Sequence, residues 1–215
     1  MPQAAQKQRA PALTPDFSLE DKYVGTVCGI DEVGRGPLAG PVVAACVVIP
    51  RHLRELPFIK EIKDSKKLSH SKRHTLFESI TKHFPYAISE ISPTKIDEIN
   101  ILQASLLAMK ISCEKVDGID HALVDGNKAP DLSCKVITVV KGDSKSVSIA
   151  AASIIAKVYR DQIMTKLALE YPSYGWDSNA GYPTKQHIIA LEQHGVTPHH
   201  RKSFGPVRRI IEHDQ

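Results

Sequence analysis

Residues 26–49 form an apolar, β-branched segment with the composition of buried β-strands, yet two acidic residues, Asp31 and Glu32, stand side by side within it. A Gly-Arg-Gly sequence at 34–36 follows them and predicts a turn between two strands. Ionised carboxylates are costly to bury, so these two need a proton, a cationic side chain or a metal ion to neutralise them. If a metal ion does so, the chain is an enzyme.

Length and composition narrow the class of protein. The chain has 215 residues, of which 42% are hydrophobic, and this is enough for one well-packed core. Its formal net charge of +4 mildly favours polyanionic partners, although many metabolic enzymes are equally basic. No stretch reaches the ~18 consecutive apolar residues of a membrane-spanning helix, and the amino terminus lacks an apolar signal segment. We therefore expect a soluble, cytoplasmic protein with no membrane partner, and we expect it to be a monomer.

Four cysteines, at positions 28, 46, 113 and 134, show no C-x-x-C spacing. Two of them lie in apolar strand-like segments, where cysteine behaves as a small hydrophobic residue. We interpret all four as reduced structural thiols in a reducing compartment rather than as zinc ligands or disulfides.

The hydrophobic pattern predicts an α/β protein whose sheet begins with antiparallel strands. Residues 1–22, rich in Gln, Ala and Pro, are predicted to be a flexible lead-in, and residues 23–215 to form the folded domain with a helical carboxyl-terminal part. We expect strands at 26–31, 41–49, 86–91, 121–124 and 135–140, and helices at 71–82, 94–116 (two consecutive helices), 144–170 and 185–194. This order is not that of a regular doubly wound sheet.

The spacing of Gly34, Gly36 and Gly40 raises the question of dinucleotide binding. A dinucleotide fingerprint needs a helix after its glycines, so that the helix amino terminus can face the pyrophosphate. The residues that follow, Pro41-Val42-Val43, predict a strand instead. We reject a dinucleotide site on this ground.

Three predicted strands end in acidic residues: Asp31 with Glu32, then Asp125, and then Asp143. Taken singly, Asp125 is a common turn residue before glycine, and Asp143 stands where a helix cap would be. If the three strands are neighbours in one sheet, however, four carboxylates converge and need cations among them. Hard oxygen ligands in this number suit Mg²⁺ or Mn²⁺.

Asp161 competes with Asp143 for the fourth position in this set. If 144–170 is one helix, Asp161 lies 18 residues beyond Asp143, which is roughly 27 Å along the helix axis. It is then too far away to share the site. We expect it to form an ion pair with Arg160 or Lys157, or to support another element of the fold.

Basic residues crowd the segment 60–73, which includes Lys66 and Lys67. They could be a solvated charged face, or they could bind phosphates with help from the hydroxyls of Ser65 and Ser69. A carboxyl-terminal group could extend such a basic track: His199, His200, Arg201, Lys202, Arg208 and Arg209. His187 and His194 have no Cys or acidic partners at metal-ligand spacing, so we expect them to be surface or packing residues.

Five sequence blocks carry a resemblance to a known family. They are GIDEVGRGPLAGPV at 29–42, DSKKL at 64–68, VDG at 124–126, AASIIAKV at 151–158 and GYPT at 181–184. Together they resemble bacterial ribonuclease HII, the type 2 ribonuclease H family, from about residue 25 to residue 205.

This resemblance implies a ribonuclease H-like fold, with a mixed central sheet flanked by helices. It further implies endonucleolytic cleavage of RNA in RNA/DNA hybrids and at ribonucleotides embedded in duplex DNA, giving 5′-phosphate and 3′-hydroxyl ends. Two divalent ions, Mg²⁺ or Mn²⁺, would be held by the family's metal-binding acids, which fall on Asp31, Glu32, Asp125 and Asp143. Its substrate-binding elements fall on Gly34, Arg35, Gly36 and the junction-sensing Tyr182, whose alternative role is packing on the last helix.

Two other classes of protein stay open on the residues alone. A catalytically silent nucleic-acid-binding module would account for the basic segment but not for the buried acids. Another two-metal nuclease, such as a DNA nuclease, would share the acids but would not require a ribose 2′-hydroxyl.

Overall fold

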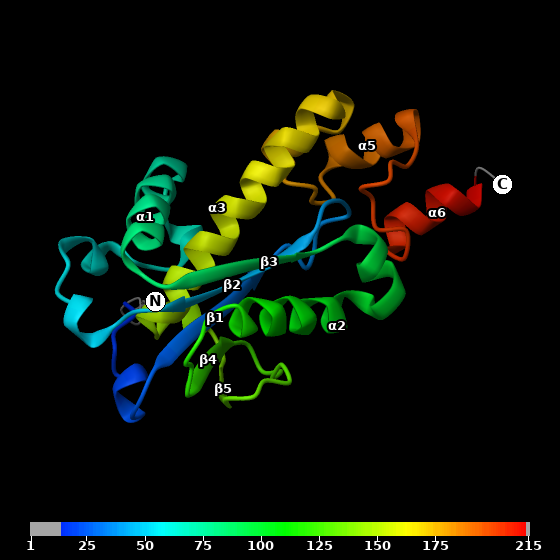
Figure 1. The fold of residues 1–215 in the computed structure, drawn as a ribbon. Coiled ribbons are helices and arrows are strands. Elements are labelled where there is room, and N and C mark those ends of the chain that lie inside the picture. Colours follow the sequence, from blue (N-terminus) through cyan, green and yellow to red (C-terminus); the bar gives the residue numbers. More distant parts are fainter. Residues whose placement is uncertain (1–13, 214–215) are drawn as a thin grey trace, which may run out of the picture.

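Five strands form one mixed sheet in the computed structural model, which describes residues 14–213 (Figure 1). The strands are β1 (Val27–Val33), β2 (Val42–Val48), β3 (Tyr86–Ile91), β4 (His121–Asp125) and β5 (Lys135–Val139), in the order β3-β2-β1-β4-β5. β1 pairs antiparallel with β2, and β2 with β3, whereas β4 is parallel to both β1 and β5. The predicted mixed α/β sheet with an antiparallel start is confirmed.

Helices cover both faces of this sheet. The helices of the described residues are α1 (His70–His83), α2 (Pro93–Glu114), α3 (Val147–Glu170), α4 (Trp176–Asn179), α5 (Lys185–His194) and α6 (Gly205–His213). β2 shows how the two cores form: Val43, Ala45 and Val47 pack with α3, while alternate residues such as Val42 and Ala44 pack with α2. Because both faces are covered, β2 is buried along its whole length.

The segment predicted as two consecutive helices is α2, and it is kinked at Asn100. This residue leaves the helical conformation, with φ 64° and ψ 164°. Its side-chain Oδ1 accepts hydrogen bonds from the backbone nitrogens of Leu102 (3.0 Å) and Gln103 (3.1 Å), as a helix cap does. The prediction of two helices is therefore confirmed.

The amino-terminal end of α3 lies directly against β1. A Cβ at Gly29 would stand 2.1 Å from the backbone carbon of Ser148, so only glycine permits this approach. The short 3₁₀ turn at Gly142–Ser144 immediately precedes α3. The close contact consequently places this turn, with Asp143 on it, beside the sheet.

The predicted lead-in lies partly outside the described residues, which begin at residue 14. The part within them differs from the prediction, because Glu20 is buried. Its Oε1 accepts hydrogen bonds from the Ser146 hydroxyl (2.7 Å) and from the Ser148 backbone nitrogen (3.0 Å). Residues 14–22 thus hold the start of α3. Contacts between residues more than 100 positions apart left no local signal in the sequence.

The predicted helical carboxyl-terminal part is also confirmed. α5 lies near the far end of α3, and α6 follows it beyond the end of the sheet (Figure 1). Their core surrounds the buried Trp176 and includes Leu38 and Ala39 from the loop after β1. This packing ties that loop to the carboxyl-terminal helices. Between residues 14 and 213, no helix is both long and apolar enough to cross a membrane.

Candidate active site

Asp31 lies near the end of β1, where its side chain faces α3 and is only 6% exposed. Its Oδ1 accepts a hydrogen bond from the backbone nitrogen of Glu32 (2.7 Å). Burial raises the pKa of Asp31 well above its ordinary value, and the charges of Glu32, Asp125 and Asp143 raise it further. The four carboxylates are therefore close enough to repel one another, as the sequence predicted.

Glu32 points to the opposite face of β1, toward α2, because side chains alternate along a strand. Its Oε1 accepts a hydrogen bond from Arg35 Nη1 at 3.3 Å. Its Oε2 is buried and has no hydrogen-bond partner within the described part of the chain. Burial raises the pKa of Glu32, and the charge of Asp125 raises it further, whereas the Arg35 guanidinium lowers it. Glu32 and Asp125 line one cavity of about 210 Å³.

Asp125 ends β4, the parallel neighbour of β1. Its Oδ1 accepts a hydrogen bond from the backbone nitrogen of Gly142 at 2.6 Å, which brings the next residue, Asp143, to the same place. Burial raises the pKa of Asp143, as do the charges of Asp64 and Asp125. The nearby Lys66 and Lys67 act in the opposite direction.

Asp161 lies elsewhere, well along α3. Its Oδ1 pairs with Nζ of Lys157 at 2.6 Å, which is one of the two ion pairs expected for it. The other candidate, Arg160, turns away and binds backbone carbonyls instead. Among the acids that raise the pKa of Asp31 is Asp143, and Asp161 is not one of them. The geometry thus favours Asp143 as the fourth carboxylate.

Two buried arginines hold the Gly-Arg-Gly loop that follows β1. Arg160 donates to the carbonyl oxygens of Ala39 and Pro41, at 3.0 and 2.9 Å. Arg201 donates to the carbonyl oxygens of Gly34 (2.6 Å) and Gly40 (2.9 and 3.0 Å), as well as to that of residue 35 at 3.1 Å. Each guanidinium therefore donates charge-assisted hydrogen bonds to several carbonyl oxygens of the loop, and these bonds hold the loop rigid.

Tyr182 lies against the same loop. A Cβ at Gly36 would stand 3.3 Å from Cε1 of the Tyr182 ring, which itself is 43% exposed. The backbone nitrogen of Leu38 donates to the carbonyl of Gly181 at 2.7 Å, and this joins the two segments. Two elements that the resemblance assigns to substrate binding, far apart in sequence, are therefore adjacent in space.

Comparison with known proteins identifies the family. A family model described as ribonuclease HII matches residues 28–207. The ribonuclease HII of Magnetococcus marinus is 51% identical, over 93% of this chain and 96% of that protein, and that of Paramagnetospirillum magneticum is 50% identical, over 92% and 98%. The chain belongs to the ribonuclease HII family. The solved ribonuclease H2 of Pyrococcus horikoshii superposes with a TM-score of 0.74 at 29% identity, covering 87% of this chain and 98% of that one.

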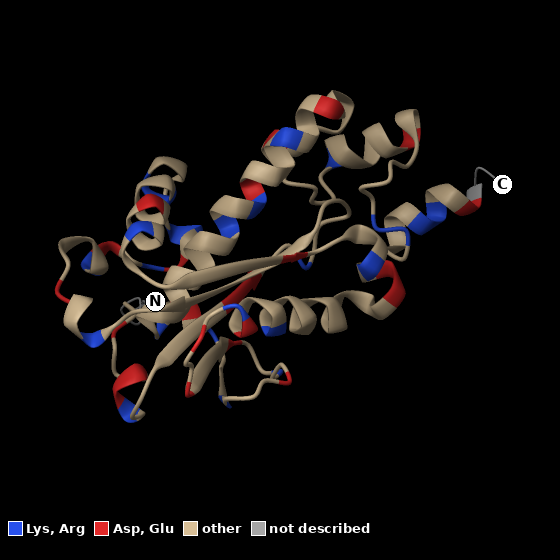
Figure 2. Cartoon of the chain, in the orientation of Figure 1, with Lys and Arg blue, Asp and Glu red and all other residues tan. Residues whose placement is uncertain are grey.

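As a member of the ribonuclease HII family, the chain is a ribonuclease H, and the predictions for its basic segment can be examined in that light. Lys66 and Lys67 are exposed on the 3₁₀ turn Ser65–Lys67, and their charges lower the pKa of Asp143. Figure 2 shows further basic positions on α1, with an acidic one among them. Ser65 is 3% exposed and its hydroxyl lies 2.7 Å from that of Ser153, so the structure turns this hydroxyl into the core instead of toward a phosphate. Ser69 caps α1.

The carboxyl-terminal basic track of this ribonuclease HII also needs correction. Arg201 and His200 are buried, so neither extends a phosphate-binding surface. His187 is buried as well, and its Nε2 lies 3.0 Å from the indole nitrogen of Trp176, which confirms its predicted packing role. Sequence reasoning missed the loop-holding roles of Arg160 and Arg201. The available signal was weak, because an arginine in an amphipathic or basic segment is normally a surface residue.

Proposed function

We propose that this ribonuclease H cuts the RNA strand of RNA/DNA hybrids and also cuts at ribonucleotides embedded in duplex DNA, leaving 5′-phosphate and 3′-hydroxyl ends. One observation carries the proposal. Four mutually repelling carboxylates, on β1, β4 and the turn before α3, adjoin a rigid Gly-Arg-Gly loop that exposes Arg35. The acids supply a place for metal ions, and the loop supplies a place to recognise the ribose.

The carboxylates have the chemistry of a site for divalent ions. Glu32 has one cationic partner, Arg35 at Oε1, but its buried Oε2 has no partner within the described residues, and the raised pKa of Asp31 reflects burial and neighbouring acids. Mg²⁺ or Mn²⁺ would be held by Asp31, Glu32, Asp125 and Asp143. Divalent ions bound there would supply activation of a water molecule and stabilisation of the leaving 3′ oxygen, while the four carboxylates would hold them in place.

The substrate would be recognised by the loop and its neighbours. Arg35 and the backbone amides at Gly34 and Gly36 would face the 2′-hydroxyl, the group that distinguishes RNA from DNA at the cut. The exposed ring of Tyr182 would stack on the sugar of the following deoxynucleotide. Lys66 would contact phosphate without regard to base sequence, since phosphate contacts position a duplex and do not specify it.

The test is a labelled duplex that contains a single ribonucleotide, incubated with Mg²⁺ or Mn²⁺, with the cut position and both new ends mapped. We expect one cut at the ribonucleotide and none in the matched all-DNA duplex. Asp143→Asn should abolish cleavage, whereas its control Asp161→Asn should keep it. Cleavage of the all-DNA duplex would instead indicate a general two-metal nuclease. Binding without cleavage at any metal concentration would indicate a binding module.

A further inference from the structure

Three cysteines from separate elements meet in the core between the sheet and α2. Cys28 lies on β1, Cys46 on β2 and Cys113 near the end of α2, and all three are buried. Their sulfur atoms all lie within 4.8 Å of one another. Within residues 14–213, no other group of three or more cysteine, histidine or acidic side chains is gathered this closely. The sequence suggested unrelated structural thiols, so this convergence was not foreseen.

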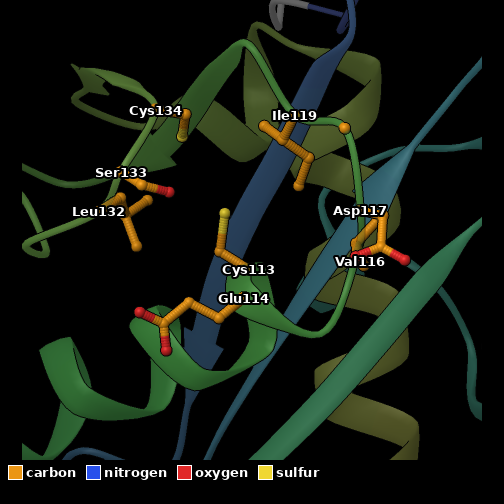
Figure 3. A pocket seen from close by; sticks show the side chains of 9 residues that line it. Cys113, Glu114, Val116, Asp117, Ile119, Leu132, Ser133 and Cys134 are labelled. Atoms are coloured by element: carbon orange, nitrogen blue, oxygen red, sulfur yellow. The ribbon is translucent and has the colours of Figure 1, made fainter.

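A fourth cysteine stands at the edge of this cluster. Cys134 precedes β5 and is partly exposed. Figure 3 shows the sulfur atoms of Cys113 and Cys134 directed toward one another across a pocket. This pocket has a volume of about 250 Å³, several times the roughly 30 Å³ that a water molecule occupies in the liquid. Of the three buried thiols, Cys113 therefore faces a pocket that it shares with Cys134.

The thiols of this cluster also influence each other's ionisation. Hydrogen bonding with Cys28 and Cys46 lowers the pKa of Cys113, while hydrogen bonding with Cys113 raises the pKa of Cys28 and that of Cys46. Cys113, which lines the pocket, is the thiol of the three that a metal ion from solvent would meet first. A thiolate is the form of cysteine that binds metal ions.

We propose that Cys28, Cys46 and Cys113 form a binding site for a soft, thiophilic metal ion such as Zn²⁺, with Cys134 as the fourth ligand at the pocket. Tetrahedral zinc with bonds of about 2.3 Å holds its sulfur ligands roughly 3.8 Å apart, so three of the sulfurs would need to close by no more than about 1 Å. Each thiol that binds loses its proton to solvent, and no sulfur is oxidised.

This site is separate from the carboxylates and differs from them in ligand chemistry. Cys28 and Glu32 share one face of β1, and at about 3.3 Å per residue they stand roughly 13 Å apart. Thiolates select Zn²⁺ and its softer analogues, whereas carboxylates select Mg²⁺ or Mn²⁺. A metal ion held by the cysteines would tie α2 and the start of β5 to the two central strands, and would therefore add stability rather than catalytic chemistry.

The probe is Cd²⁺, whose bonds to thiolates absorb in the ultraviolet while its bonds to carboxylates do not. The full-length protein, reduced and stripped of metal, is titrated with Cd²⁺ in excess Mg²⁺. We expect one equivalent to bind with thiolate absorbance, Zn²⁺ to displace it, and Zn²⁺ alone to raise the unfolding temperature. Cys113→Ala should lose the absorbance. Cys134→Ala should lose about a quarter of it, as one of four ligands disappears. Ser133→Ala, on the same pocket, is the matched control and should behave as wild type.

Several outcomes would overturn the proposal: no thiolate absorbance in the wild type, an absorbance that survives Cys113→Ala, or binding by Cys113 and Cys134 alone. Because Cys113→Ala could fail to fold, alkylation of the wild type provides a second measurement. Zn²⁺ should protect all four thiols, as counted by mass spectrometry. Unprotected thiols in the presence of Zn²⁺, or a Cys113–Cys134 disulfide that forms in air whether or not Zn²⁺ is present, would refute the site.

Discussion

Replacing Asp31 by asparagine should raise the free energy of unfolding of the metal-free protein while it abolishes cleavage. The pKa of Asp31 is raised by burial and by three neighbouring acids, so its ionised form is less stable in the folded chain than in the unfolded one. The stability that this group contributes is fully present below its unfolded pKa and is lost as the pH rises through its folded pKa. The asparagine side chain would keep the shape and remove the charge.

The size of the gain follows from the cost of a buried polar group without compensation, about 1–3 kcal/mol and more when it is charged. For a chain of this length, each kcal/mol moves the unfolding temperature by about 2–4 °C, so we expect a rise of roughly 2–12 °C. In saturating Mg²⁺ the wild type should unfold at a higher temperature than Asp31→Asn. A ligand at 100 times its dissociation constant stabilises the folded state by about 2.7 kcal/mol, and Asp31→Asn would lose much of this gain.

Thermal unfolding in EDTA at pH 8, followed by the same scans with Mg²⁺, measures both effects. Asp161→Asn is the matched control, because Asp161 already has a cationic partner in Lys157. Its removal should leave the unfolding temperature unchanged or lower it slightly. An Asp31→Asn protein that unfolds at or below the wild-type temperature in EDTA would refute the reasoning. The reasoning would also be refuted if the difference in unfolding temperature between Asp31→Asn and the wild type did not shrink as the pH is lowered toward 4.

The remaining predictions concern the loop, the buried histidines and the substrate. Arg201→Lys should lower the unfolding temperature and raise KM for an RNA/DNA hybrid, because a lysine ammonium lacks the planar set of donors that binds three carbonyl oxygens here. Wild-type values for both quantities would contradict the loop-holding role. Burial lowers the pKa of His200 to about 3. As the pH falls from 7.5 to 5, His200 therefore takes up a proton in the unfolded chain but not in the folded one, and this should lower the free energy of unfolding by about 2 kcal/mol. A His200→Gln protein whose stability depends on pH as the wild type's does would argue against this. Replacing Lys66 and Lys67 by Ala should weaken binding equally for all sequences and flatten its dependence on salt, and an unchanged slope would return them to a solvated face. Tyr182→Ala should slow cleavage at a single embedded ribonucleotide more than within a long RNA strand, by ~1–3 kcal/mol in single-turnover assays; equal losses would make it a packing residue.

Local sequence patterns predicted most of the elements. Continuous apolar segments identified β1 and β2, the strand β3 was also predicted, and helical periodicity identified α1 and α3 with small errors at their ends. The kink in α2 was also predictable, since it arises from a short-range cap at Asn100. The isolated turn of α4 was not, because four helical residues carry no periodic signal.

The sequence by itself predicted which carboxylates come together in the structure. Acids at the ends of adjacent buried strands must meet, and helix length alone separated Asp161 from Asp143. Only the tertiary structure decided the parts that depend on burial: the inward hydroxyl of Ser65, the buried Arg201 and the docking of Glu20 on α3. The physical reason is that a polar side chain can satisfy its hydrogen bonds either with water or with a backbone group that is distant in the sequence. That choice is made by partners far away in the chain, which no local pattern reveals.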